Sequence, residues 1–195
     1  MKKERDTKLK ILDAALLYAS EYGIEMLTIG KLSEIVGMSK SGLFAHFKSK
    51  ETMQISMLEY ASEVFINTVM VPAIKKPRGI GRIRAIAENW RMWDTNSLPG
   101  GCPFISASVE FDDRPGKVRD RLQSLQQQWI DTLAHSAKLA VEAGEFKKET
   151  DCKLFAFEFN ALMLGYNHYL RMLGDKKAKE LHAKALDNLI EKNRQ

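Results

Sequence analysis

Histidine and cysteine are the side chains best suited to hold a transition metal or to act as a nucleophile. The chain has four histidines, at positions 46, 135, 168 and 182, and two cysteines, at 102 and 152. No two of them are three or four residues apart, the spacing that places two ligands on one face of a helix. A metal site would need ligands from distant segments, and the sequence predicts none.

Cys102 is the best candidate for a reactive thiol, with His135 or His168 as its base. It precedes Pro103 in a turn and has no activating neighbour in the sequence. A thiol-dependent helical enzyme is therefore kept only as an alternative. The sequence predicts no catalytic residue and no cofactor.

Residues 28–50 suggest a different chemistry, the recognition of nucleic acid. If residues 40–47 form a short helix, Lys40, Ser41, Phe44 and His46 lie on its outer face. A helix that presents such side chains can enter the major groove of DNA and contact base edges.

Two short helices joined by a tight turn are needed to position these side chains. Thr28 can cap a first helix, Gly37 can end it in the left-handed conformation, and Ser39 can cap the second. This is the pattern of a helix-turn-helix. The inward side chains expected to hold the pair together are Leu32, Val36, Met38, Leu43 and Phe47.

Residues 28–51 resemble the DNA-reading segment of the TetR-type (TetR/AcrR) bacterial regulators. The matching residues are Thr28, Gly37-Met38-Ser39, Leu43-Phe44-Ala45-His46-Phe47 and Ser49-Lys50-Glu51. The resemblance implies DNA contacts by Thr28, Ser39, Lys40, Ser41, Phe44, His46 and Lys50, with Thr28 and Lys50 on phosphates. Phe44 departs from the tyrosine usual in the family, so its contact is expected to be apolar, to a thymine methyl.

Composition supports an all-helical protein. Hydrophobic residues make up 45% of the 195 residues, there are five prolines, and no strand pattern is evident. The net charge is +5, and residues 1–50 carry nine basic and six acidic residues, a net +3 that favours DNA phosphates. No signal peptide and no apolar run of membrane-spanning length is evident, which predicts a cytoplasmic protein with no membrane partner.

Domain boundaries follow from helix signals and from the charged Pro-Gly segment at residues 75–79. A helix-turn-helix domain is predicted for 1–50, a connecting helix for 50–72 that ends at Pro72, and a helical regulatory domain for 73–195. Helix 1 is expected over 5–22. Later helices are expected over 81–94, 104–111, 117–143, 151–173 and 176–192.

Asp151 is expected to cap a helix over 151–173, and this helix is apolar on two faces. One stripe contains Phe155 and Phe159, and a second contains Leu154, Phe157, Ala161 and Leu164. A small domain cannot bury both stripes, so the helix is expected to meet another chain. The predicted interface residues are Leu162, Gly165, Tyr166 and Tyr169.

Aromatic side chains are abundant between residues 90 and 159, and apolar walls are what a pocket between helices requires. The predicted ligand-binding residues are Trp90, Trp93, Phe104, Phe111, Trp129, Phe155 and Phe159. The segments Gly100-Gly-Cys-Pro-Phe104, Glu110 and Pro115 also resemble one subgroup of TetR-type regulatory domains.

The resemblance implies a homodimer that binds a palindromic, double-stranded operator and is released by a small, mostly apolar inducer. Repression is the expected mode, with the connecting helix transmitting the change. An architectural DNA-binding dimer without a ligand is the alternative in the same class.

Overall fold

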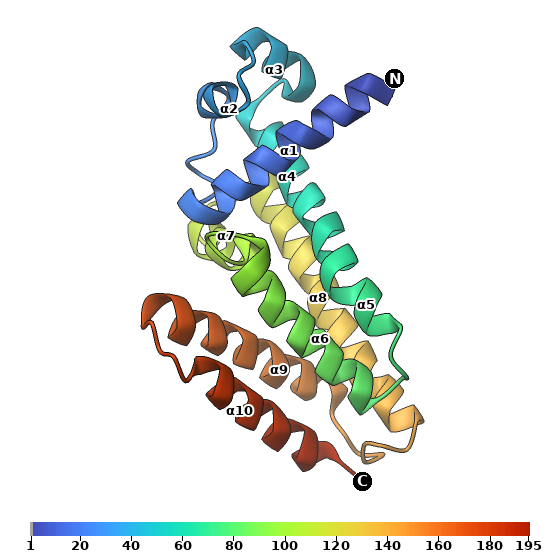
Figure 1. The fold of residues 1–195 in the computed structure, drawn as a ribbon. Helices are drawn as coiled ribbons and strands as arrows, with labels where there is room; N and C mark the ends of the chain where they lie inside the picture. Colours follow the sequence, from blue (N-terminus) through green and yellow to red (C-terminus); the bar gives the residue numbers. More distant parts are fainter. Residues whose placement is uncertain (1) are drawn as a thin grey trace. The chain divides into compact units, whose positions relative to one another are not determined.

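The computed structural model describes the backbone of residues 2–195 and the side chains of residues 5–195, and over this range it is helical, as predicted. The only β-type pairing among these residues is an isolated bridge between Phe146 and Arg194. Lys2 and Lys3, which contribute to the predicted N-terminal charge, have side chains outside the described residues. The elements (Figure 1) are α1 (Lys2–Tyr22), α2 (Ile29–Val36), α3 (Lys40–Phe47), α4 (Lys50–Phe65), η1 (Ile66–Met70), α5 (Val71–Ile74), α6 (Ile80–Met92), η2 (Trp93–Ser97), α7 (Pro103–Phe111), α8 (Lys117–Glu142), α9 (Cys152–Asn167), η3 (His168–Met172) and α10 (Ala178–Asn193).

The helices form two compact units, and neither unit is a single stretch of chain. Unit 1 contains the residues up to Phe65 together with Thr95–Leu125, and unit 2 contains Ile66–Asp94 and Gln126–Gln195. The segment 95–125, which the sequence places in the regulatory domain, therefore packs with the helix-turn-helix. The first part of α8 belongs to unit 1 and the rest to unit 2.

Helix α4 does not end at Pro72, contrary to the sequence prediction. It passes into the π-helical turn η1 at Ile66, and Pro72 lies in the first turn of the short helix α5. Proline is tolerated in the first turn of a helix, and here the π-helical turn η1 replaces the regular α-helical hydrogen bonds just before it. The connecting helical stretch therefore extends to Ile74.

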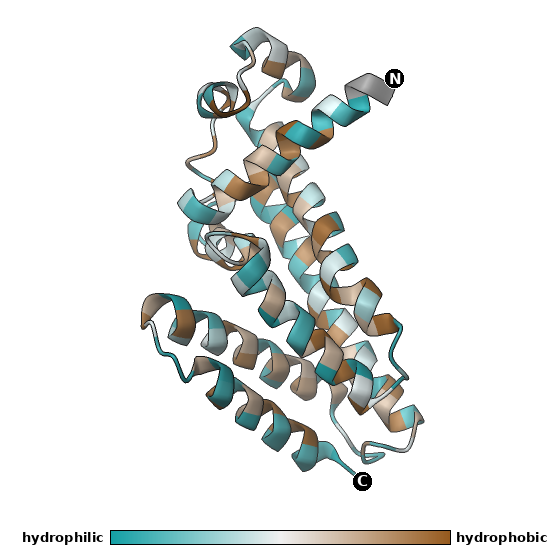
Figure 2. Cartoon of the chain, in the orientation of Figure 1, coloured by the Kyte–Doolittle hydropathy of each residue, from teal (hydrophilic) through white to brown (hydrophobic). Residues whose placement is uncertain are grey.

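Unit 1 is built on the side of α1 that carries Ile11, Ala15 and Ala19, all of them buried. Helices α1 and α4 contact each other, and α1 also contacts α2 and α7. The hydropathy colouring shows apolar residues alternating with polar ones along these helices (Figure 2), as expected for helices with one buried face.

Unit 2 contains α9 packed against α10 and α6. Its core includes Phe146, Phe155 and Phe159, with ring centroids 5.3 Å apart for the first two and 6.1 Å apart for the last two. Asp151 begins α9 by accepting hydrogen bonds from the amides of Lys153 and Leu154, as the sequence predicts.

Candidate nucleic-acid interface

The predicted capping residues hold the helix pair of unit 1 in place. Thr28 Oγ1 accepts a hydrogen bond from the Lys31 amide at 3.0 Å and begins α2. Gly37 ends α2 with φ of 67°, in the left-handed region that favours glycine. Ser39 Oγ accepts from the Gly42 amide at 3.1 Å and begins α3. The pair thus has both its turn and its two helix starts fixed by local chemistry.

The buried faces of α2 and α3 leave one face of α3 exposed. Leu32, Leu43 and Phe47 are fully buried, while Val36 and Met38 are half-buried. Lys40 and Ser41 are exposed, and Phe44 has 56% of its surface accessible to solvent. More than half of the Phe44 surface is therefore available for contact with another molecule.

His46 differs from the other residues on α3 that were predicted to contact DNA. It is half-buried, and its ring centroid lies 6.2 Å from that of Phe47. Its contact with DNA stays a prediction.

Lys48 is a feature that the sequence does not reveal. It ends α3 with φ of 58° and ψ of −30°, and it is the one described residue other than glycine with positive φ. Its side chain is exposed beside the outer face of α3. A non-glycine residue held in this region costs about 1 to 3 kcal/mol, and such strain concentrates at functional sites.

Lys50, predicted to contact a phosphate, is already bound within unit 1. Its Nζ lies 2.7 Å from Glu25 Oε1 and donates to the Glu25 carbonyl oxygen, also at 2.7 Å. The hydrogen bond from Lys50 lowers the pKa of the Glu25 carboxyl below its ordinary value. An ammonium group has three N–H donors, so one remains for a phosphate.

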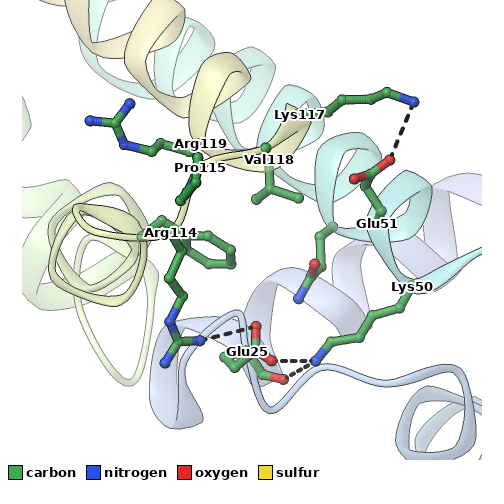
Figure 3. Close-up of a pocket in the computed structure, with 11 residues that line it drawn as sticks. Glu25, Lys50, Glu51, Arg114, Pro115, Lys117, Val118 and Arg119 are labelled. Carbon is green, nitrogen blue, oxygen red and sulfur yellow. Dashed lines mark hydrogen bonds and ion pairs between the residues drawn. The ribbon is translucent and has the colours of Figure 1, made fainter.

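A hollow of about 330 Å³ lies beside this pair and is shown in Figure 3. One wall comes from Glu25 and the start of α4, and the other from Phe111 and the loop that leads into α8. Ion pairs join the walls: Arg114 is 3.6 Å from Glu25, and Lys117 is 3.5 Å from Glu51. The hollow is lined by four cations, Lys50, Arg114, Lys117 and Arg119, and by two carboxylates, Glu25 and Glu51, so its lining carries a net positive charge.

The residues predicted to bind a ligand are divided between the two units. Phe104 and Phe111 belong to unit 1, where the Phe104 ring packs edge-on against Phe65 and Phe111 lines the hollow. The other five lie in unit 2. Of these, Trp129 is half-buried and donates its indole N–H to Asn160 Oδ1 at 3.0 Å. The fully buried ones are Trp90, Trp93, Phe155 and Phe159.

The α9 residues predicted to contact a second chain differ in accessibility. Gly165 and Tyr169 are exposed, and Leu162 is half-buried. Tyr166 is buried and packs edge-on against the Trp90 and His182 rings. The second apolar stripe of the helix is exposed, as the sequence predicts, and comprises Leu154, Phe157, Ala161 and Leu164.

Two further groups of residues bear on alternative functions. Within the described part of the chain, no three His, Cys, Asp or Glu side chains converge as a metal site would require. Cys102 is buried and Cys152 is partly buried. Burial raises the pKa of the Cys152 thiol, which disfavours the reactive thiolate. None of the helices described has the length and apolar character needed to cross a membrane.

A capped helix-turn-helix with an exposed second helix, combined with a helical second unit, defines a class of DNA-binding regulators. Comparison with known protein families supports the same class. Residues 11–56 match the model for bacterial regulatory proteins of the tetR family, and residues 79–186 match the tetracyclin repressor-like C-terminal domain. The chain belongs to the TetR family of bacterial transcriptional regulators.

Individual relatives are distant in sequence. A fatty acid metabolism regulator protein from Bacillus subtilis (strain 168) is 20% identical over 156 residues, covering 79% of this chain and 78% of that protein. A TetR transcriptional regulator from Chloroflexus aurantiacus J-10-FL has a TM-score of 0.85 at 24% identity, covering 97% and 95% of the two chains. AibR, solved in complex with isovaleryl coenzyme A and operator DNA, has a TM-score of 0.69 at 18% identity, covering 93% and 94%.

Proposed function

We propose that this chain is a ligand-responsive repressor that binds a palindromic operator as a homodimer. The observation that carries the proposal is the exposed face of α3, where Lys40, Ser41 and Phe44 project from a helix fixed by the Ser39 cap. Two such helices related by a two-fold axis would read inverted half-sites in successive major grooves.

The exposed stripe of α9 supports the homodimer. Leu154, Phe157, Ala161 and Leu164 follow one another at spacings of three, four and three residues, the pattern of a helix seam that packs against another helix. Ala161 and Gly165 are small and would allow close approach of the two backbones. We place the interface on this stripe, with Gly165 and Tyr169 at its side and Tyr166 behind it in the core.

The aromatic side chains of unit 2 support a small, mostly apolar inducer. AibR was solved with an acyl coenzyme A, and the Bacillus subtilis relative is named for fatty acid metabolism. Isovaleryl coenzyme A is therefore the first probe to titrate, with the emission of the three tryptophans as the signal. A genuine inducer must also weaken operator binding, and by reciprocity the operator must weaken the ligand by the same factor.

Selection of duplexes from a randomised pool tests the DNA-binding proposal. The enriched sequences should contain an inverted repeat, and binding to the most enriched duplex should fall steeply with salt. Equal affinity for the enriched duplex and a scrambled one at every salt concentration would reject the proposal.

Two substitutions separate base reading from phosphate contact. Lys40→Ala should change which bases are enriched, since it removes a side chain from the outer face of α3. Lys50→Ala should weaken binding to all sequences and flatten the salt slope by roughly one unit.

A further inference from the structure

The irregular turn between α1 and α2 is held from both sides by long-range hydrogen bonds. From α7, the Glu110 carboxylate accepts the Ile24 N–H at 3.2 Å and the Glu25 N–H at 2.7 Å. From α4, Gln54 donates to the Ile24 carbonyl at 2.9 Å and Lys50 to the Glu25 carbonyl at 2.7 Å. Side chains from two other helices therefore fix both amides and both carbonyls of this segment.

The chain is shaped to let Glu110 reach the turn. Gly23 has φ of 88°, and a Cβ atom at this position would lie 2.3 Å from Glu110 Oε1. Gly100 likewise lies against the end of α1, where a Cβ atom would be 1.7 Å from the Ser20 carbonyl oxygen. Both glycines provide space that no other residue would leave. The segment 95–125 thus fits closely against the C-terminal end of α1.

The Glu25 side chain completes the connection. Its carboxylate lies 2.7 Å from Lys50 Nζ and 3.6 Å from Arg114 Nη1, so it bridges α4 and the α7–α8 loop across the hollow of Figure 3. We name Ile24, Glu25, Lys50, Gln54, Glu110 and Arg114 the turn joint. Its contacts are polar and partly solvated, and such contacts break at lower energy than a well-packed apolar core.

We infer that Glu110 and Arg114 are positioning residues for DNA binding, which act by holding the α1–α2 turn and touch no DNA themselves. The inference rests on the DNA-binding function proposed above. The helix-turn-helix of α2 and α3 begins at its cap Thr28, three residues after Glu25, and the next helix, α4, begins at Lys50. The turn joint therefore fixes the chain just before α2 and just after α3, and it determines the orientation of the outer face of α3.

The segment that carries Glu110 and Arg114 is continuous in the chain with unit 2 at both of its ends. The chain passes between the units at Phe65–Ile66, at Asp94–Thr95 and at Leu125–Gln126. The last two junctions bracket the segment that carries Glu110 and Arg114.

Glu110→Gln tests the inference against a matched control, Glu51→Gln. Both changes remove one negative charge from unit 1, but Glu110 accepts the amides of the turn, whereas Glu51 forms an ion pair with Lys117. The probe is the duplex that the wild-type protein enriches from a randomised pool. If only the loss of a negative charge mattered, both variants should bind the duplex more tightly than the wild type does. The inference predicts about tenfold weaker binding by Glu110→Gln only, with an unchanged salt slope because no phosphate contact is lost.

Arg114→Gln and its control Arg119→Gln repeat the test on the other wall of the hollow. Each removes one positive charge, but only Arg114 contacts Glu25, whereas Arg119 donates to the Asp112 carbonyl. Arg114→Gln should weaken binding several-fold more than Arg119→Gln. Combining Arg114→Gln with Glu25→Gln should add little to the loss in Glu25→Gln alone, since Glu25→Gln already removes the carboxylate that Arg114 contacts.

Hydrogen exchange provides a readout that is independent of DNA. The amides of Ile24 and Glu25 should exchange about tenfold faster in Glu110→Gln than in the wild type, and at the wild-type rate in Glu51→Gln. If the wild type enriches a duplex and Glu110→Gln binds it as tightly as Glu51→Gln does, the positioning role is wrong. If the wild type enriches no sequence, the proposed function itself fails, and the exchange rates still decide whether Glu110 holds the turn.

Discussion

The exposed face of α3 in unit 1 is mostly polar, whereas the exposed stripe of α9 in unit 2 is apolar. The placement of charged and titratable groups also differs between the units. In unit 1 the turn joint includes partly exposed ion pairs, whereas in unit 2 Asp94 and His182 are buried within the unit. Salt should therefore weaken the partner contacts of unit 1, and acid should destabilise the interior of unit 2.

The largest effect is expected from placing a charge on the apolar stripe of α9. Phe157 is 69% exposed, so Phe157→Arg should leave the fold of one chain intact. In a dimer the new guanidinium would be buried without a partner, which should raise the dimer dissociation constant at least about a hundredfold. Sedimentation measures this directly.

Val109→Arg is the matched control for this prediction. Val109 is also highly exposed, but it lies on α7 in unit 1. The same change of residue there should leave the dimer intact. If Phe157→Arg leaves the dimer unchanged, or if Val109→Arg dissociates it, the predicted interface lies on the wrong unit. The contrast between the two exposed surfaces would then not hold.

A smaller effect is expected at His182 in α10. This side chain is 5% exposed, neither ring nitrogen has a hydrogen-bond partner, and its ring packs 5.3 Å from that of Tyr166. Burial, with a smaller contribution from the positive charge of Arg91, lowers its pKa from 6.5 to about 4. The unfolded chain therefore takes up a proton as the pH falls below 6.5, while the folded chain does so only near pH 4.

Folding stability must accordingly fall between pH 6.5 and 4, by up to about 3 kcal/mol from this group. His182→Leu should abolish this part of the acid sensitivity, measured as the free energy of unfolding in denaturant at pH 7 and pH 4.5. His135→Leu, at an exposed position on α8, should retain the wild-type dependence. An equal loss of stability in His182→Leu and the wild type would show that acid acts elsewhere.

Local features of both units could be predicted from the sequence because they depend on neighbouring residues. The sequence predicted that α2 begins at Thr28 and ends at Gly37, that α3 begins at Ser39, and that α9 begins at Asp151. The structure confirms all four caps. A cap involves residues within about four positions, so its chemistry is visible in the sequence. The exposed stripe of α9 follows from helical periodicity in the same way.

Long-range features could not be predicted in this way. Glu110 and Glu25 are 85 residues apart, and no periodicity in the sequence brings α7 to the α1–α2 turn. The π-helical turns η1, η2 and η3 were likewise missed, because an extra residue in a helical turn leaves little compositional trace. Tyr166 fits the apolar pattern of α9, but only tertiary packing shows that it faces Trp90 and His182.

The smallest effect is expected at Lys48 in unit 1. Two substitutions there separate the effect of backbone strain from the effect of the side-chain charge. Lys48→Gly removes both the positive-φ strain and the ammonium group, whereas Lys48→Gln removes the ammonium group alone. Relative to Lys48→Gln, Lys48→Gly should raise the free energy of unfolding by about 1 kcal/mol, since glycine adopts this conformation without steric cost. Both variants should lose about one unit of salt slope in DNA binding if the exposed Lys48 ammonium contacts a phosphate. Equal free energies of unfolding for the two variants would show that Lys48 is unstrained. A wild-type salt slope in both variants would show that the Lys48 ammonium group contacts no phosphate.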